Sequence, residues 1–155
     1  MKGKFMREAI RLSIQKMRRG QGGPFGAVVV RGGRVIGRGW NKVTSANDPT
    51  AHAEVVAIRE ACRRLKTFQL NGCDLYTSCE PCPMCLSAIY WARLRNVFYG
   101  NTRKDAAKID FDDDFLYREV ALPIRRRKLV MRQLLHREAL VAFAEWQRKP
   151  DRILY

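Results

Sequence analysis

The sequence contains no long apolar run and no secretion signal. Its 155 residues include only short hydrophobic stretches, with residues 27–30 among the longest, whereas a membrane-spanning helix needs about 18 or more apolar residues in succession. The basic residues near the N-terminus are not followed by the apolar segment of a signal peptide. We therefore expect a cytoplasmic protein with no membrane partner.

Repeats, low-complexity tracts and linkers are also missing. Hydrophobic residues make up 46% of the chain and charged residues 29%, a composition that is typical of globular proteins and excludes fibrous, collagen-like and disordered chains. A chain of this length is close to the usual size of one domain. We therefore predict that residues 1–155 form a single domain.

Acidic residues are scarce. Fifteen Asp and Glu face thirty Lys and Arg, which gives a formal net charge of +15. Such a charge attracts polyanions, so nucleic acid is one candidate partner. Arginine-rich, solvated surfaces would produce the same composition without any polyanion, and we favour that explanation.

Short apolar runs bounded by turn-forming residues predict strands over residues 25–31, 34–40, 74–78 and 96–100. Gly32 and Gly33 form a two-residue connection that is typical of a β-hairpin between the first two strands. A further strand is predicted over residues 128–133. Because predicted helices separate the later strands, we expect a layered α/β fold that contains parallel strands.

Apolar residues spaced three and four apart predict helices over residues 5–17, 48–65, 81–93, 103–108, 114–119 and 135–148. Asp48 with Pro49 would begin the second of these helices, and Pro81 would begin the third. Residues 41–47 are expected to form a polar loop. The buried side of the second helix is expected to carry Val55, Ile58, Ala61 and Cys62.

Histidine is scarce as well, since the chain has only two. His52 and Glu54 lie in the opening turns of one predicted helix, and Cys82 and Cys85 lie in the first turn of another. Cysteines three residues apart share a helix face, and a helix N-terminus favours the thiolate, so both sulfurs can bind one ion. Zinc binds cysteine and histidine together. Three protein ligands leave a position for a catalytic water, and Glu54 is placed to take its proton.

A closed zinc site is the alternative. Cys79, at the same spacing again, would complete a Cys3His set that has no place for water. Against this alternative, Cys79 ends a predicted strand, and a closed site leaves Glu54 without a role. Cys62 and Cys73 are isolated and are expected to be small buried apolar residues, because a chain without a secretion signal rarely forms disulfides. His136 is expected on the surface of the last helix.

The combination of His-x-Glu with Pro-Cys-x-x-Cys is the signature of zinc deaminases. At these residues the chain resembles the cytidine-deaminase-like superfamily, and more closely the small bacterial guanine deaminases. The stretches that carry the resemblance are residues 22–28, 47–54, 76–85, 88–93, 111–113 and Tyr155. Residues 47–54 look the same in tRNA adenosine deaminases, whereas residues 77–85, the Tyr90-Trp91 pair and the Phe-Asp-Asp run at 111–113 favour the guanine branch.

The resemblance implies hydrolytic removal of the 2-amino group of guanine, which yields xanthine and ammonia. It implies one zinc ion per chain, with a catalytic water or hydroxide. It also implies a three-layer α/β/α sandwich with a mixed central sheet, the cytidine-deaminase-like fold. The implied assembly is a homodimer in which a C-terminal segment, about residues 135–155, is exchanged between subunits.

The resemblance also assigns residues to roles. It makes His52, Cys82 and Cys85 the zinc ligands, and it makes Glu54 the proton shuttle. The substrate-binding residues that it implies are Phe25, Asn41, Ala53, Trp91, Asp113 and Tyr155.

Physical chemistry supports several of these substrate contacts. A flat purine needs apolar faces for stacking, which Phe25 and Trp91 would supply, and a few placed polar groups, which Asn41 and Asp113 would supply. Asp113 would accept paired N–H bonds from N1 and the 2-amino group, a pattern that adenine does not offer. The resemblance implies that Tyr155 closes the site, either of its own chain or of the partner chain. The alternatives are that the aromatic residues belong to the core and that the aspartates form a solvated cluster or a helix N-cap.

Other functions stay open at this point. A tRNA adenosine deaminase would use the basic surface to hold RNA while a base is flipped into the site. A nucleic-acid-binding module with a purely structural zinc ion is a second alternative. Cytosine, isocytosine and amino-triazines present amidine-like groups similar to that of guanine, so the sequence leaves the substrate breadth open.

Overall fold

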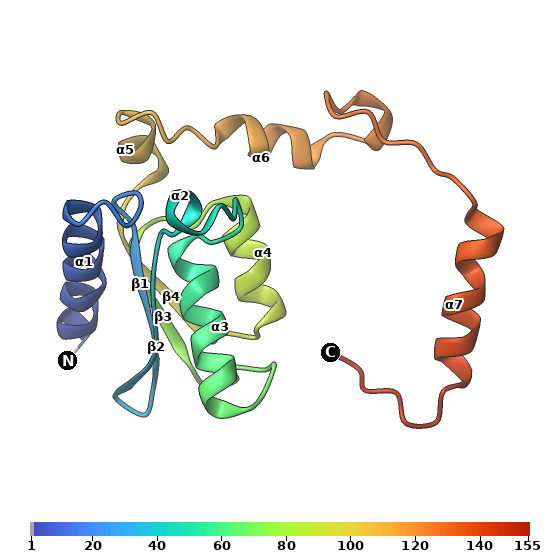
Figure 1. Ribbon diagram of the computed structural model, residues 1–155, viewed down its shortest axis with the longest axis horizontal. Helices are drawn as coiled ribbons and strands as arrows, with labels where there is room; N and C mark the ends of the chain where they lie inside the picture. The colour runs from blue at the N-terminus through green and yellow to red at the C-terminus, as the bar shows by residue number, and fades with distance from the viewer. Residues whose placement is uncertain (1) are drawn as a thin grey trace. The chain divides into compact units, whose positions relative to one another are not determined.

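The computed structural model describes residues 2–155 and has one mixed sheet of four strands in the order β2-β1-β3-β4 (Figure 1). The strands are β1 (Gly26–Arg31), β2 (Arg34–Trp40), β3 (Asp74–Cys79) and β4 (Asn96–Asn101). β1 runs antiparallel to both β2 and β3, whereas β3 and β4 are parallel. Gly32 and Gly33 connect β1 to β2 with φ values of 54° and 75°, as a two-residue hairpin turn requires. The mixed sheet and the hairpin are confirmed.

Helices cover both faces of this sheet (Figure 1). α1 lies on one face, and α3 and α4 lie on the other; their bounds are Lys2–Arg18, Ala53–Leu65 and Pro83–Trp91. Successive side chains of β1 point to opposite faces, so Val28 and Val30 pack toward α1 while Ala27 and Val29 pack toward α3 and α4. The three-layer α/β/α sandwich is therefore confirmed.

Glycine lets α3 lie very close to β2. A Cβ atom on Gly39 would lie 1.9 Å from the carbonyl oxygen of Ala53, and one on Gly37 would lie 2.3 Å from that of Ala57. Any side chain at these positions would push the helix away from the sheet, because the interface is already close-packed. Gly37 and Gly39 therefore set the position of the start of α3, where His52 lies.

α3 begins later than the sequence predicted. It starts at Ala53 with His52 as its N-cap, so the prediction of an N-cap at Asp48 is wrong. The carboxylate of Asp48 instead accepts hydrogen bonds from the amide and hydroxyl of Thr50, at 2.8 and 2.7 Å. Aspartate often stabilises a turn in this way, and here the turn comes before the helix.

α4 also begins later than predicted, at Pro83 with Cys82 as its N-cap, and not at Pro81. Pro83 occupies the first helical turn, where a missing N–H is not needed. The predicted polar loop over residues 41–47 contains a short helix, α2 (Val43–Ala46). None of the helices in residues 2–155 is long and apolar enough to cross a membrane.

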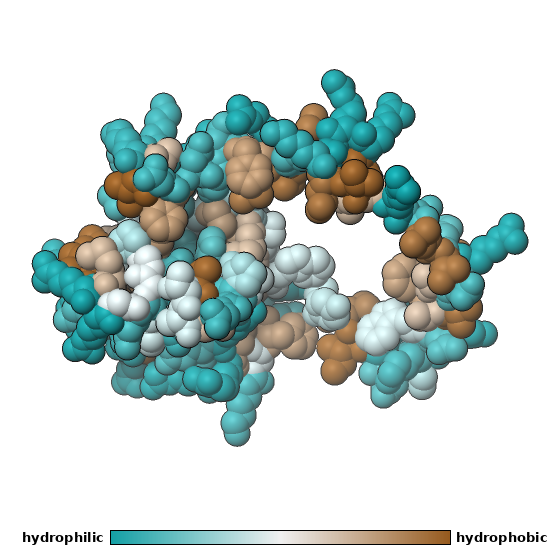
Figure 2. All heavy atoms as spheres, turned by 45° about the horizontal axis from the view of Figure 1, so that its top comes forward, coloured by the Kyte–Doolittle hydropathy of each residue, from teal (hydrophilic) through white to brown (hydrophobic). Residues whose placement is uncertain are grey.

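The chain divides into two compact units, of which the second comprises residues 114–155. The first unit also contains α5 (Arg103–Ala107), and the second contains α6 (Asp114–Ala121), the 3-10 helix η1 (Ile124–Arg126) and α7 (His136–Arg148). None of residues 114–155 is buried. Large apolar side chains on α7 and just before it are exposed, and Figure 2 shows such side chains on the surface; they include Leu134, Leu135, Val141, Phe143 and Trp146. A single domain over residues 1–155 stays a prediction.

The strand predicted over residues 128–133 is wrong, because these residues form no strand. The guanidinium of Arg127 donates hydrogen bonds to the carbonyl oxygens of Val120 and Leu122. The amide of Lys128 donates to the carboxylate of Glu119 at 2.8 Å. These bonds hold the start of the segment at the end of α6, and its remaining residues pair with no strand of the sheet.

Candidate active site

Two helix N-termini bring the predicted metal ligands together. His52 is the N-cap of α3, Cys82 is the N-cap of α4, and Cys85 lies in the first turn of α4. Nδ1 of His52 lies 3.6 Å from Sγ of Cys82 and 3.5 Å from Sγ of Cys85. All three ligand atoms lie within 4.8 Å of one another. The three residues that the sequence indicates thus form one cluster.

The spacing of the cluster fits a zinc ion. With Zn–N near 2.05 Å and Zn–S near 2.3 Å, tetrahedral coordination places a nitrogen and a sulfur ligand about 3.6 Å apart. The separations in the cluster are 3.6 and 3.5 Å. Within residues 2–155, Cys79 is not part of this group, and its thiol donates to the carbonyl oxygen of Thr102 at 3.7 Å. The cluster therefore offers three ligands and leaves the fourth tetrahedral position open.

Charge is unevenly distributed between the two sulfurs. Hydrogen bonding with Cys85 lowers the pKa of Cys82 to about 4, and His52 acts in the same direction. The lowered pKa favours the thiolate form of Cys82, which is the form that binds a metal ion. The hydrogen bond to Cys82 raises the pKa of His52. The pKa of Cys85 is also raised, first by its bond to Cys82 and then by burial.

Glu54 lies in the first turn of α3, beside the cluster, and only 6% of its surface is exposed. Its Oε1 accepts a hydrogen bond of 3.0 Å from the hydroxyl of Thr77, and its Oε2 accepts one of 3.4 Å from the thiol of Cys85. Burial raises the pKa of Glu54, although the bond from Thr77 opposes this effect. A carboxyl group with a raised pKa can accept a proton and return it, as general acid–base catalysis requires.

A pocket of about 570 Å³ adjoins the cluster, and Asn41 is among the residues that line it. Asn41 is buried, and its Oδ1 accepts hydrogen bonds from the backbone amides of Gly23 at 3.4 Å and Val43 at 3.2 Å. Because the oxygen is used in this way, the side-chain NH2 group is the part of Asn41 that can donate to a ligand.

Three other residues predicted to contact the substrate also line this pocket. Phe25 meets Phe111 edge to face, with ring centroids 4.9 Å apart and an interplanar angle of 86°, and both rings border the pocket. Ala53 is fully buried. Asp113 is half-buried, and burial raises its pKa, with the negative charge of Cys82 acting in the same direction. Apolar walls and an acceptor group thus meet beside the cluster.

The lining of the pocket is rich in carboxyl groups. They belong to Glu54, Glu80, Asp110, Asp112 and Asp113. Arg103 is the arginine in this lining, and its backbone amide donates to Glu80 at 3.0 Å. Such a lining repels polyanions but not a neutral ligand.

Two predicted substrate contacts do not line the pocket. Trp91 ends α4, is 66% exposed, and borders a separate hollow with Tyr90 and Arg93. Tyr155 belongs to the second unit and is 73% exposed. The roles of Trp91 and Tyr155 therefore stay predictions.

Sequence reasoning missed several residues at this site, namely Thr77, Glu80, Arg103 and Phe111. Thr77, Glu80 and Phe111 lie within the stretches that carried the family resemblance, so their place in those motifs could have identified them. The residues around Arg103 form no motif that would identify it as a site residue. It reaches the pocket because α5 follows β4 directly.

Comparison with known proteins agrees with this geometry. The family model of the cytidine and deoxycytidylate deaminase zinc-binding region matches residues 1–101. The chain is 51% identical over 143 residues to a guanine deaminase of Bacillus subtilis strain 168, and the match covers 92% of each protein. An X-ray structure of guanine deaminase from Bacillus subtilis has a TM-score of 0.96 and 48% identity to this chain, covering 99% of this chain and 98% of that one. A tRNA-specific adenosine deaminase of Aquifex aeolicus is 43% identical over 96 residues, which are 62% of this chain and 63% of that protein.

The matched region includes the whole metal cluster and Glu54. It extends over well more than half of the chain, and the ligand spacing is that of a zinc site. The chain belongs to the cytidine and deoxycytidylate deaminase zinc-binding family.

Proposed function

We propose that this protein is a guanine deaminase, which hydrolyses guanine to xanthine and ammonia and holds one zinc ion per chain. The observation that carries the proposal is the extent of similarity, because 92% of the chain matches the Bacillus subtilis guanine deaminase at 51% identity. The match to the tRNA-specific adenosine deaminase of Aquifex aeolicus covers only 62% of the chain. The acidic pocket lining supports the same choice, since it suits a neutral base better than RNA phosphates.

The proposed chemistry uses the cluster and Glu54 together. His52, Cys82 and Cys85 would hold the zinc ion, which supplies the nucleophile by lowering the pKa of a water molecule at the open position. Glu54 takes the proton that this water loses and gives it to a ring nitrogen beside C2. The water oxygen bonds to C2, and a second transfer through Glu54 moves the remaining proton of that oxygen to the amino group, so that the C2–N bond breaks and ammonia leaves. Guanine and water thus become xanthine and ammonia.

The polar groups of the pocket would select the base. The hydrogen bonds from Gly23 and Val43 orient Asn41 so that its NH2 group can donate to an acceptor atom of the purine. Asp113 would accept hydrogen bonds from N1–H and the 2-amino group, which adenine does not present together. Phe25 would stack against the ring, and Ala53 would border it.

The active form that we propose is a homodimer in which about residues 135–155 are exchanged. The exposed apolar side chains of α7, including Phe143 and Trp146, support this assembly, because surfaces of this kind are usually covered by a partner (Figure 2). In this assembly Tyr155 would close the site of the partner subunit, and Trp91 would supply an apolar wall. The cytoplasmic location expected from the sequence stays a prediction.

A substrate panel tests the proposal. The zinc-loaded protein is incubated with guanine, adenine, cytosine, isocytosine, an amino-triazine and a tRNA anticodon stem-loop, and released ammonia is measured. We expect guanine to give the highest kcat/KM. Inosine formation in the stem-loop without ammonia from guanine would contradict the proposal and favour an adenosine deaminase.

A further inference from the structure

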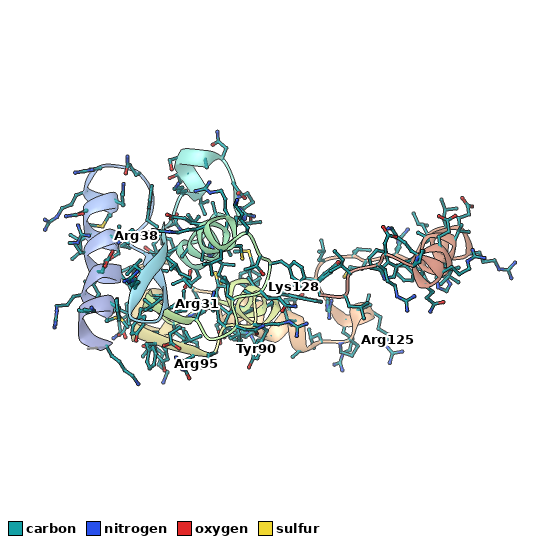
Figure 3. All side chains as sticks on the ribbon, turned by 90° about the horizontal axis from the view of Figure 1, so that it is seen from below. Arg31, Arg38, Tyr90, Arg95, Arg125 and Lys128 are labelled. Carbon is teal, nitrogen blue, oxygen red and sulfur yellow. The ribbon has the colours of Figure 1, made fainter. Side chains whose placement is uncertain are left out.

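Six arginines lie in the segments at the end of the sheet that is opposite the starts of α3 and α4, where the metal cluster lies; Figure 1 shows these segments. α3 and α4 both begin at the metal cluster, so their C-termini lie at this far end of the first unit. The β1–β2 hairpin turns there, and β4 begins there. The six exposed residues that we call the arginine end are Arg31, Arg34, Arg63, Arg64, Arg93 and Arg95. Figure 3 views the protein from below and labels Arg31 and Arg95.

Few carboxylates balance this cluster. Arg95 pairs with Asp74, with Nη2 and Oδ2 3.0 Å apart. The other five arginines have no ion pair within residues 2–155. Five carboxyl groups of the first unit line the pocket instead. The first unit therefore has an acidic pocket and a basic opposite end.

Helix capping explains only part of this arrangement. Basic residues in the last turn of a helix complement its dipole, which accounts for Arg63 and Arg64 at the end of α3. Arg31 and Arg34 belong to a hairpin and Arg95 lies beside a strand start, so no helix terminus requires them. A surface ligand of opposite charge would account for all six.

We propose that the arginine end binds the phosphate backbone of a nucleic acid, at a surface separate from the deaminase pocket. The planar guanidinium group makes paired hydrogen bonds to phosphate oxygens, and all six residues carry it. Tyr90 is exposed on α4, three residues before Arg93 in the sequence. An exposed aromatic side chain beside arginine can stack on unpaired bases, so single strands bind better than duplexes.

The size of the surface sets the expected salt dependence. Four strand ends about 4.8 Å apart span roughly 14 Å, which allows about three phosphate contacts. For a single strand each contact contributes about −0.7 to the slope of log K against log salt, giving a slope of about −2. The affinity should then fall roughly 16-fold between 50 and 200 mM KCl.

The test measures fluorescence anisotropy of labelled 20-nucleotide RNA and DNA, single-stranded and duplex, with the full-length zinc-loaded protein. Arg31→Glu/Arg34→Glu is compared with Arg7→Glu/Arg11→Glu, which changes the net charge equally on the exposed face of α1. We expect the hairpin variant to lose about tenfold or more in affinity and the α1 variant to lose less than about threefold. Both variants should deaminate guanine like the parent, since none of these residues lines the pocket.

Several results would overturn the proposal. They are an equal loss of nucleic-acid affinity in the two variants, an affinity that does not depend on salt, and an unchanged affinity of the hairpin variant. Tighter binding to phosphatidylserine vesicles than to nucleic acid would also overturn it. Thermal melting checks that each variant is folded. If a glutamate variant unfolds, the glutamine pairs at the same positions provide the same comparison.

A different observation concerns Thr77, and we infer that it is a positioning residue for Glu54. Thr77 lies on β3 with 1% of its surface exposed, and its hydroxyl donates to Oε1 of Glu54 at 3.0 Å. β3 is held by β1 on one side and by β4 on the other, so this donor is rigidly placed. A fixed donor keeps the Glu54 carboxylate in one rotamer, which proton transfer requires.

This inference rests on the proposed function, and its test compares Thr77→Val, Thr77→Ser and Ser78→Ala. We expect Thr77→Val to lower kcat about tenfold or more with KM within about twofold, and Thr77→Ser to restore most of kcat. Ser78 is the control, because its buried hydroxyl accepts from the amide of Gly26 away from Glu54; its loss should lower the melting temperature but not kcat. Zinc content is measured on every sample.

Equal kcat for Thr77→Val and the parent would overturn the inference, and so would a failure of serine to restore kcat in a folded, zinc-loaded variant. The activity of the parent enzyme distinguishes a failure of this inference from a failure of the proposed function. If the parent deaminates a base other than guanine, the proposed function fails, and the same three variants are compared on that base.

Discussion

Replacing Glu54 with glutamine separates its chemistry from its place in the fold. Glutamine has nearly the same shape, and its side-chain oxygen can still accept the 3.0 Å hydrogen bond from Thr77. Because burial raises the pKa of Glu54, its carboxyl group lowers the stability of the fold at neutral pH. A neutral amide removes that cost. We therefore expect Glu54→Gln to melt at the same temperature as the parent or higher.

The rate should fall steeply in the same variant. Glutamine cannot take a proton from water, and each general acid–base transfer contributes about 10²–10⁴-fold. Two transfers through Glu54 together imply a loss of at least about 10⁴-fold in kcat, or roughly 5.5 kcal/mol of the barrier. The assay is xanthine formation from guanine, with the zinc content and melting temperature of each sample. A kcat within tenfold of the parent, at equal zinc content, would refute the role of Glu54.

Three further predictions concern the metal, the base and the C-terminus. Cys79→Ser should retain about one zinc per chain while Cys82→Ser loses it, as measured by metal analysis and the absorption of the cobalt form. An equal loss of zinc in the two variants would indicate a closed four-ligand site. Asp113→Asn should lower kcat/KM for guanine roughly 5- to 150-fold without loss of zinc, since a mismatched buried polar contact costs about 1–3 kcal/mol. Unchanged kinetics would indicate that Asp113 belongs to a solvated acidic cluster and does not contact guanine. Deleting residues 151–155 should lower activity about tenfold or more, and mixing this protein with Glu54→Gln should restore part of it if Tyr155 comes from the partner. Full activity of the truncated protein alone would remove Tyr155 from the site.

Local chemistry explains which features the sequence could predict. A two-residue hairpin turn can need positive φ at both residues, which glycine adopts readily, so the hairpin at Gly32 and Gly33 follows directly from the local sequence. The three-residue spacing of Cys82 and Cys85 places both sulfurs on one helix face, and His52 joins them because the helices that carry these residues start at the same end of the sheet. These features depend on few neighbours.

Features that depend on more distant contacts were harder to predict. Asp48 can cap a helix or stabilise a turn, and the hydrogen bond that it accepts from the hydroxyl of Thr50 favours the turn. The segment over residues 128–133 has the composition of a strand, but Arg127 and Glu119 hold its start against the end of α6. The side chain of Thr77 gives no local sign that it meets Glu54, because the contact forms only when β3 packs against α3.

The source of the new oxygen in the product distinguishes hydrolytic deamination of guanine from other reactions. Guanine is incubated with the zinc-loaded protein in ¹⁸O-enriched water, and xanthine and ammonia are quantified by mass spectrometry and a coupled assay. We expect equimolar ammonia and xanthine, one ¹⁸O atom in each xanthine, and neither product above background with Glu54→Gln. Guanine that is returned unchanged by the zinc-loaded parent would contradict hydrolytic deamination by this protein, and so would xanthine without the label.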